Sequence, residues 1–216
     1  MTEQNFEQMR KAMVASQLRT TGINDPRVIA AMGAVPRERF VPAGRTGVAY
    51  ADALIPLANG RQLNTPMSLG RLLTEAAPRP GDKALVIGAG TGYAAAVMAQ
   101  LVQSVVAVEE DLELIGAART VLKGSGVKLV EAPLTKGHKA GAPYDLILID
   151  GAVEEVPQSL IAQLAENGRL AAAILDGGVA RISIGRRGGD GFGMVAVSDV
   201  ASAILPGFEK PRGFTF

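Results

Sequence analysis

The residues with the clearest capacity for chemistry form a glycine-rich turn. The run Gly88-Ala-Gly-Thr-Gly92 stands between the apolar run 84–87 and the alanine-rich run 93–101. Glycines let the backbone turn sharply and let a ligand approach where a Cβ would clash. Glu109 follows about twenty residues after the turn, at the end of the apolar run 105–108, where a carboxylate can accept both ribose hydroxyls. The pattern predicts a nucleoside site formed by Gly88, Ala89, Gly90, Gly92 and Glu109.

The residue after the turn indicates which nucleoside cofactor binds. A dinucleotide fingerprint needs a third small residue at position 93, where the helix packs closely on the sheet, and Tyr93 stands there instead. A compact Gly-x-Gly-x-Gly followed by Tyr93 favours S-adenosylmethionine over NAD. The alternative is a purely structural turn, with Glu109 as a solvated residue at the strand end.

Two further polar residues are candidates for work on a methyl acceptor. Asn64 precedes the Thr65-Pro66 start of a helix, and its amide can donate a hydrogen bond to a substrate carboxylate but cannot act as acid or base. Asp150 follows the apolar run 146–149, at the sheet edge where open α/β sheets bind ligands, and it could take a proton from a hydroxyl acceptor. The structural alternatives are that Asn64 only caps the helix and that Asp150-Gly151 forms a turn.

Composition excludes several other classes of protein. The 216 residues are 48% hydrophobic and carry a net charge of +1, so we expect a folded protein without a nucleic-acid or membrane partner. The absence of Cys excludes disulfides, thiolate zinc sites and Cys nucleophiles, and a single histidine, His138, excludes His-rich metal sites. We therefore expect no metal. The polar segment Met1 to Lys11 is unlike a signal peptide, so we expect a cytoplasmic protein.

Strands and helices must position these residues, and the sequence predicts both. Residues 81–176 alternate short apolar runs with helical patterns, which is typical of a parallel sheet covered by helices on both faces. The expected strands are 84–87, 105–108, 127–130, 146–149 and 170–175, and the expected helices are 93–101, 112–122 and 157–165, the last capped by Gly168. Runs 179–184 and 194–200 predict an antiparallel hairpin that closes the sheet. The first third predicts helices that begin after Asp25 and Thr65.

The chain resembles the protein-L-isoaspartate O-methyltransferase family over nearly its whole length. The matching stretches are Ile23–Val28, Val35–Pro42, Ala49–Asp52, Leu85–Tyr93, Val108-Glu109, Ala142–Asp145, Val156-Pro157 and Gly168–Leu170. The resemblance implies an α/β fold with a Rossmann-like class I methyltransferase sheet and an N-terminal helical cap. Residues 1–80 would form the cap and residues 81–216 the S-adenosylmethionine-binding domain. It also implies protein repair, in which the carboxylate of an isomerised aspartate in damaged protein or peptide is esterified.

The chain departs from the family pattern at the positions closest to that chemistry. Asn64 stands where the family has Ser, and Pro133 stands where it has an Asp facing the adenine, which predicts weaker cofactor binding. Other departures are Gly137-His138, Ile149-Asp150-Gly151 and the run 202–207. Two alternatives therefore stay open. One is the same cofactor with a different acceptor and Asp150 as base, and the other is a non-catalytic member that binds a nucleoside ligand or a partner.

Overall fold

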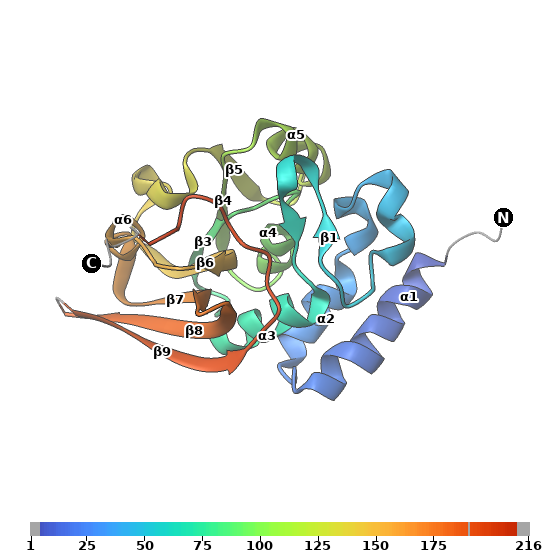
Figure 1. The fold of residues 1–216 in the computed structure, drawn as a ribbon, viewed down its shortest axis with the longest axis horizontal. Helices are drawn as coiled ribbons and strands as arrows, with labels where there is room; N and C mark the ends of the chain where they lie inside the picture. The colour runs from blue at the N-terminus through green and yellow to red at the C-terminus, as the bar shows by residue number, and fades with distance from the viewer. Residues whose placement is uncertain (1–4, 190, 211–216) are drawn as a thin grey trace.

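The computed structural model describes residues 5–189 and 191–210, which form a seven-stranded sheet covered by helices (Figure 1). The strand order is β5-β4-β3-β6-β7-β8-β9. Neighbouring strands from β5 to β7 are parallel, whereas β8 is antiparallel to both β7 and β9. The bounds are β3 Lys83–Ile87, β4 Ser104–Glu109, β5 Val127–Glu131, β6 Tyr144–Val153, β7 Leu164–Asp176, β8 Val179–Gly188 and β9 Gly191–Asp199. The predicted α/β sheet and closing hairpin are confirmed. Asp190 and the first four residues of the polar N-terminal segment lie outside the described residues.

Both faces of the sheet are buried, which explains why its inner strands are nearly uninterrupted apolar runs. Alternate residues of β3 enter different clusters: Ala84 and Val86 pack with the N-terminal helices, whereas Leu85 and Ile87 pack on the opposite face. The covering helices are α3 Pro66–Ala76, α4 Tyr93–Met98, α5 Leu112–Val121 and α6 Gln158–Ile161. Because residues 84–108 form β3, α4 and β4, their lack of charge reflects burial inside this sandwich. Among the described residues, no helix is long and apolar enough to cross a membrane.

The predicted helix at 157–165 is wrong in its extent. Helix α6 covers only Gln158–Ile161, and β7 begins at Leu164, which pairs with Tyr144 of β6. Gly168 lies inside β7 and does not cap a helix. A Cβ at Gly168 would come within 2.8 Å of the Ala165 carbonyl oxygen, so glycine is needed there for close backbone packing. Pairing with β6 therefore ends the helix earlier than local propensity suggests.

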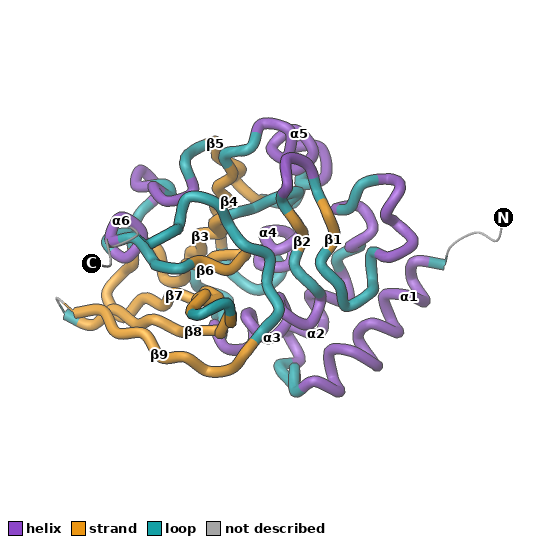
Figure 2. Tube along the Cα trace, in the orientation of Figure 1, coloured by secondary structure: helices purple, strands orange, loops and turns teal. Residues whose placement is uncertain are grey.

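The N-terminal helices follow the predicted signals. Helix α1 covers Phe6–Met13 and continues through a π-helical turn, Val14–Leu18, which matches the five-residue step from Met13 to Leu18. Helix α2, Pro26–Ala34, is capped by Asp25, whose carboxylate accepts from the backbone N–H groups of Arg27 and Val28. A β1–β2 strap then precedes α3. It comprises β1 Ile55–Pro56, a 3-10 turn and β2 Gln62–Leu63, and Figure 2 labels both strands.

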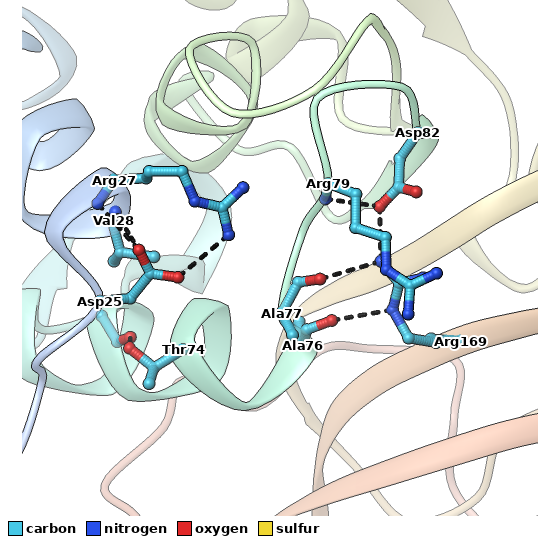
Figure 3. A network of polar contacts seen from close by, with 10 residues as sticks. Asp25, Arg27, Val28, Thr74, Ala76, Ala77, Arg79, Asp82 and Arg169 are labelled. Atoms are coloured by element: carbon cyan, nitrogen blue, oxygen red, sulfur yellow. Dashed lines mark hydrogen bonds and ion pairs between the residues drawn. The ribbon is translucent and has the colours of Figure 1, made fainter.

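Two connections hold α3 and the C-terminal segment on the sheet. Arg169 of β7 donates to the carbonyls of Ala76 and Ala77 at the end of α3 (3.0 and 3.1 Å) and forms a buried ion pair with Asp82 (Figure 3). At the carboxyl ends of the strands, the segment that follows β9 crosses the end of β6. There the Leu205 N–H donates to the Ala152 carbonyl (2.9 Å). That crossing brings residues 202–205 to the carboxyl ends of the strands, next to the glycine turn.

Candidate active site

The glycine turn adopts backbone conformations that favour glycine. Gly88, Gly90 and Gly92 have φ values of +76°, +55° and +101°, in a region that residues with a Cβ rarely adopt. The N–H groups of Gly88 and Ala89 both donate to the carbonyl of Val108 (3.0 Å each), which fixes the turn against the end of β4. Helix α4 begins directly after Gly92. The predicted strand–turn–helix unit is therefore present, with Ala89 inside it.

Glu109 ends β4 beside the turn and is fully buried. Its Oε2 accepts from the N–H of Gly90 (2.7 Å), and its Oε1 accepts from the N–H groups of Glu110 and Asp111 (3.0 and 3.2 Å). Arg61 of the β1–β2 strap binds both oxygens, with Nη1–Oε1 at 2.8 Å and Nη2–Oε2 at 3.2 Å. The structure thus excludes the alternative of a solvated strand-end residue, because Glu109 is a buried, fully hydrogen-bonded carboxylate.

The turn and Glu109 fit a nucleoside in their backbone and donor chemistry. Side chains from three other segments cover them in this structure. A Cβ at Gly88 would lie 2.9 Å from the Leu205 side chain, one at Gly90 would lie 3.6 Å from Leu57, and one at Gly92 would lie 2.9 Å from Leu122. Leu57, Leu122 and Leu205 thus pack directly against the turn, whose backbone already has the shape that a nucleoside site needs.

Tyr93 lies under the N-terminal cap at the start of α4. Its fully buried ring makes an edge contact with Phe40, with centroids 5.5 Å apart, and the Arg37 guanidinium stacks over it at 4.7 Å. Burial raises the pKa of the Tyr93 hydroxyl. Thr91, also in the turn, donates its hydroxyl to the Phe40 carbonyl (2.6 Å). These contacts join the glycine turn to the cap, so the two are built as one unit.

Asn64 and Asp150, the two predicted acceptor-side residues, are in direct contact. Asn64 donates from Nδ2 to Oδ1 of Asp150 at 2.7 Å, and both residues are buried. Its Oδ1 accepts from the Ala203 N–H (2.8 Å) and from the Ser202 hydroxyl (3.1 Å). Thr65 caps α3 by accepting from Ser68, so the capping alternative for Asn64 is wrong. The Asn64 side chain is fixed between β6 and the C-terminal segment instead.

Asp150 occupies a bulge rather than a turn. It lies inside β6, where the register against β7 shifts between Leu148 and Ala152, so the Asp150-Gly151 turn alternative is also wrong. A bulge redirects the side chains around it, and such irregularities recur near functional sites. Burial raises the pKa of the Asp150 carboxyl, while the hydrogen bond from Asn64 and the charges of Arg37 and Arg61 oppose that rise. Asp150 is therefore a buried carboxyl with a pKa above its ordinary value.

Sequence reasoning missed two arginines of this site. Arg37 is fully buried and donates to the carbonyls of Ala49 (2.7 Å) and Asn64 (2.5 Å), while its Nη1 has no hydrogen-bond partner. Burial lowers its pKa. Arg37 lies in Val35–Pro42, a stretch that resembles the family, and that resemblance could have marked it as a site residue. Nothing in the sequence linked Arg61 to Glu109. Within the described part of the chain, no group of three or more His, Cys, Asp or Glu residues could hold a metal ion.

Comparisons with known proteins identify the family. Residues 8–200 match the family model of protein-L-isoaspartate(D-aspartate) O-methyltransferase. The chain belongs to this family. A protein-L-isoaspartate O-methyltransferase from Methylorubrum extorquens is 40% identical over 85% of this chain and 82% of its own length, and one from Herpetosiphon aurantiacus is 36% identical over 94% and 92%. The family resemblance predicted from the motifs is confirmed.

Solved structures confirm the class I methyltransferase fold. A protein-L-isoaspartate O-methyltransferase superposes with a TM-score of 0.79 at 22% identity, over 94% of this chain and 66% of that one. A Plasmodium falciparum protein described by the same name, crystallised with S-adenosyl-L-homocysteine, superposes with a TM-score of 0.78 at 20% identity, over 94% and 99%. This family member is accordingly an S-adenosylmethionine-dependent methyltransferase, and the cofactor expected from the glycine turn is the family's cofactor.

Proposed function

We propose that this family member esterifies the carboxylate of an isomerised aspartate in damaged protein or peptide. The observation that carries the proposal is the buried Asn64–Asp150 pair at the carboxyl ends of the strands, close enough to Glu109 for the charges of Asp150 and Glu109 to interact. Open α/β sheets bind their ligands at this edge. A cytoplasmic location belongs to the same proposal and is supported by the absence of Cys.

The cofactor roles in this proposal follow from the shape of the turn and from the acid beside it. Gly88, Ala89, Gly90, Gly92 and Tyr93 would line the nucleoside, and Glu109 would accept from the ribose hydroxyls. S-adenosylmethionine supplies, when bound, a methyl group on a positively charged sulfur. Asn64 and Asp150 meet on β6, beside the carboxyl ends of β3 and β4, and would face the acceptor side of this site.

Asn64 orients the acceptor in this mechanism. Its Nδ2 is a hydrogen-bond donor that an acceptor carboxylate can share with Asp150. Arg37 holds the Asn64 backbone by donating to its carbonyl. Because burial raises the pKa of Asp150, its repulsion of an anionic acceptor is lost at a higher pH than for a solvated aspartate. Transfer of a methyl group from a sulfonium to a carboxylate would need no base from this chain, because the acceptor oxygen is already anionic. No proton moves, so alignment alone can supply most of the rate.

The cap is part of the proposed function. Residues 1–80 act as a cover that completes the acceptor side, and residues 81–216 hold the cofactor. In support, the cap contributes Arg37, Asn64 and the Phe40 carbonyl to the site, and its apolar residues share one core with β3 and α4. The cover therefore shares its core with the sheet and cannot be removed without exposing that core.

A hydroxyl acceptor with Asp150 as base is the second candidate, favoured by the raised pKa of Asp150. A base near neutrality is most effective when its pKa approaches the working pH. The two candidates differ in what Asp150→Asn does. A carboxylate acceptor needs no base, so transfer persists in that variant, whereas transfer to a hydroxyl is lost.

The test is transfer of a tritiated methyl group to an isoaspartyl peptide, with the aspartyl peptide of the same sequence as substrate control. We expect labelling of the isoaspartyl peptide only, a loss of labelling in Asn64→Ala, and no loss in the exposed control Asn24→Ala. Calorimetry with S-adenosylhomocysteine accompanies the assay, and Glu109→Ala should weaken its binding. Intact binding of S-adenosylhomocysteine without preferential labelling of the isoaspartyl peptide would overturn the assigned acceptor.

A further inference from the structure

The feature that the proposed function leaves unexplained is the bond between Arg61 and Glu109. Two oxygens of a carboxylate offer about four lone-pair positions. Glu109 already accepts two bonds from Arg61 and three from the backbone N–H groups of Gly90, Glu110 and Asp111. Glu109 is therefore saturated, and ribose hydroxyls cannot be added unless one of these donors leaves.

Arg61 is the donor that can leave. The three backbone donors belong to the turn and to the end of β4, whereas Arg61 is a side chain of the β1–β2 strap. Beyond the ion pair with Glu109, the tip of the strap donates one hydrogen bond to the N-cap residue of α5, from Asn59 to Asp111 (2.8 Å), and places Leu57 near Gly90. A cavity of about 230 Å³ lies between the strap and α5, lined among others by Leu57, Ala58, Leu114 and Ala117. Ile55 and Leu63 anchor the two strands of the strap in the core, whereas its tip, residues 57–61, has few polar attachments and has space beside it.

Arg61 also needs a new partner once it leaves. Its side chain is 8% exposed, and a buried cation without an anion or a full set of acceptors is strongly disfavoured. Asp150 is a poor replacement, because Asn64 already occupies its Oδ1. Asp111 is another carboxylate near Arg61, but its oxygens already accept from Asn59 and from the first N–H groups of α5. Carboxylates from ligands are the anions that the proposed reaction adds at this edge.

We propose that Arg61 is a ligand-binding residue that exchanges Glu109 for a ligand carboxylate when the nucleoside binds. This inference rests on the proposed function for the identity of the ligands. The planar guanidinium suits the task, because it forms the same paired geometry with any carboxylate. The carboxylate comes either from the amino-acid end of the cofactor or from the acceptor, and the two sources give different results on mutation.

The experiment compares Arg61→Met with wild type and with the exposed control Arg19→Met, using adenosine and S-adenosylhomocysteine as calorimetric probes. Adenosine carries no carboxylate, so it reports only the release of Glu109. We expect Arg61→Met to bind adenosine roughly tenfold more tightly, within the range usual for coupled equilibria. If the cofactor supplies the carboxylate, Arg61→Met raises the affinity for S-adenosylhomocysteine much less than it raises the affinity for adenosine. If the acceptor supplies the carboxylate, Arg61→Met raises the affinities for adenosine and for S-adenosylhomocysteine by the same factor. In that case KM for the isoaspartyl peptide also rises, with little change in kcat.

An unchanged adenosine affinity in Arg61→Met, within twofold of the Arg19→Met control, would overturn the proposal. Arg61→Lys covers the case in which the methionine variant does not fold, because a lysine keeps the charge but loses the paired contact. We expect Arg61→Lys to bind adenosine with an affinity between those of wild type and Arg61→Met. A wild-type affinity in Arg61→Lys would also contradict the proposed exchange of Glu109 for a ligand carboxylate. Failure of the proposed function has a different signature, namely tighter adenosine binding in the variant with no methyl transfer by any form of the protein.

Discussion

Replacing Asn64 tests whether its buried side chain organises the acceptor side of the site. The side chain is 5% exposed and makes three hydrogen bonds, with Asp150, Ala203 and Ser202. Asn64→Ala leaves the Asp150 carboxyl and the buried Ala203 N–H without this partner. An unsatisfied buried group costs about 1–3 kcal/mol, so two of them predict a loss of about 2–6 kcal/mol in the free energy of unfolding. In a chain of this length, that lowers Tm by at least about 4 °C.

A second variant at this position gives the same interaction a pH signature. Asn64→Asp places two carboxyls 2.7 Å apart, and both cannot be ionised together. At least one carboxyl pKa is then raised in the folded state above its unfolded value. The contribution of that carboxyl to the free energy of unfolding is therefore most favourable at a pH below the ordinary carboxyl pKa, and it is lost as the pH rises. We expect a larger destabilisation at pH 8 than at pH 5.

Urea unfolding of both variants at the two pH values measures these effects. The exposed control Asn24→Ala should stay within about 0.5 kcal/mol of wild type. The reasoning is refuted if Asn64→Ala loses less than about 1 kcal/mol, or if the loss in Asn64→Asp is the same at both pH values.

Two further outcomes follow from buried charges. Burial raises the pKa of Asp150 above its unfolded value, so its ionisation disfavours the folded state progressively as the pH rises. Asp150→Asn should therefore gain stability relative to wild type between pH 4 and pH 8 in urea titrations, and a pH-independent difference contradicts this. Arg169→Met should lose about 3–5 kcal/mol in the same measurement, because it leaves Asp82 buried without its ion-pair partner. The exposed pair of Arg181 and Asp199 provides the control, since Arg181→Met should lose less than about 1 kcal/mol.

The sequence alone determined the features that depend on neighbouring residues. The glycine turn, the caps at Asp25 and Thr65 and the alternation of strands and helices could be predicted, because backbone conformation and short-range hydrogen bonds decide them. The same local signals carried the family resemblance. Where a distant segment intervened, local reasoning failed, as at α6, which ends early because β7 pairs with β6.

Only the tertiary structure decided how the candidate residues are partnered. Asn64 and Asp150 could be predicted as separate candidates, but their contact joins residues 86 positions apart. Likewise, Glu109 could be predicted as a strand-end acid, whereas its pairing with Arg61 depends on the path of the β1–β2 strap over the turn. Such contacts are fixed by how the cap and the C-terminal segment pack on the sheet. Local propensity does not predict that packing, because the partners of the buried charges come from segments that are distant in the sequence and meet only in the folded chain.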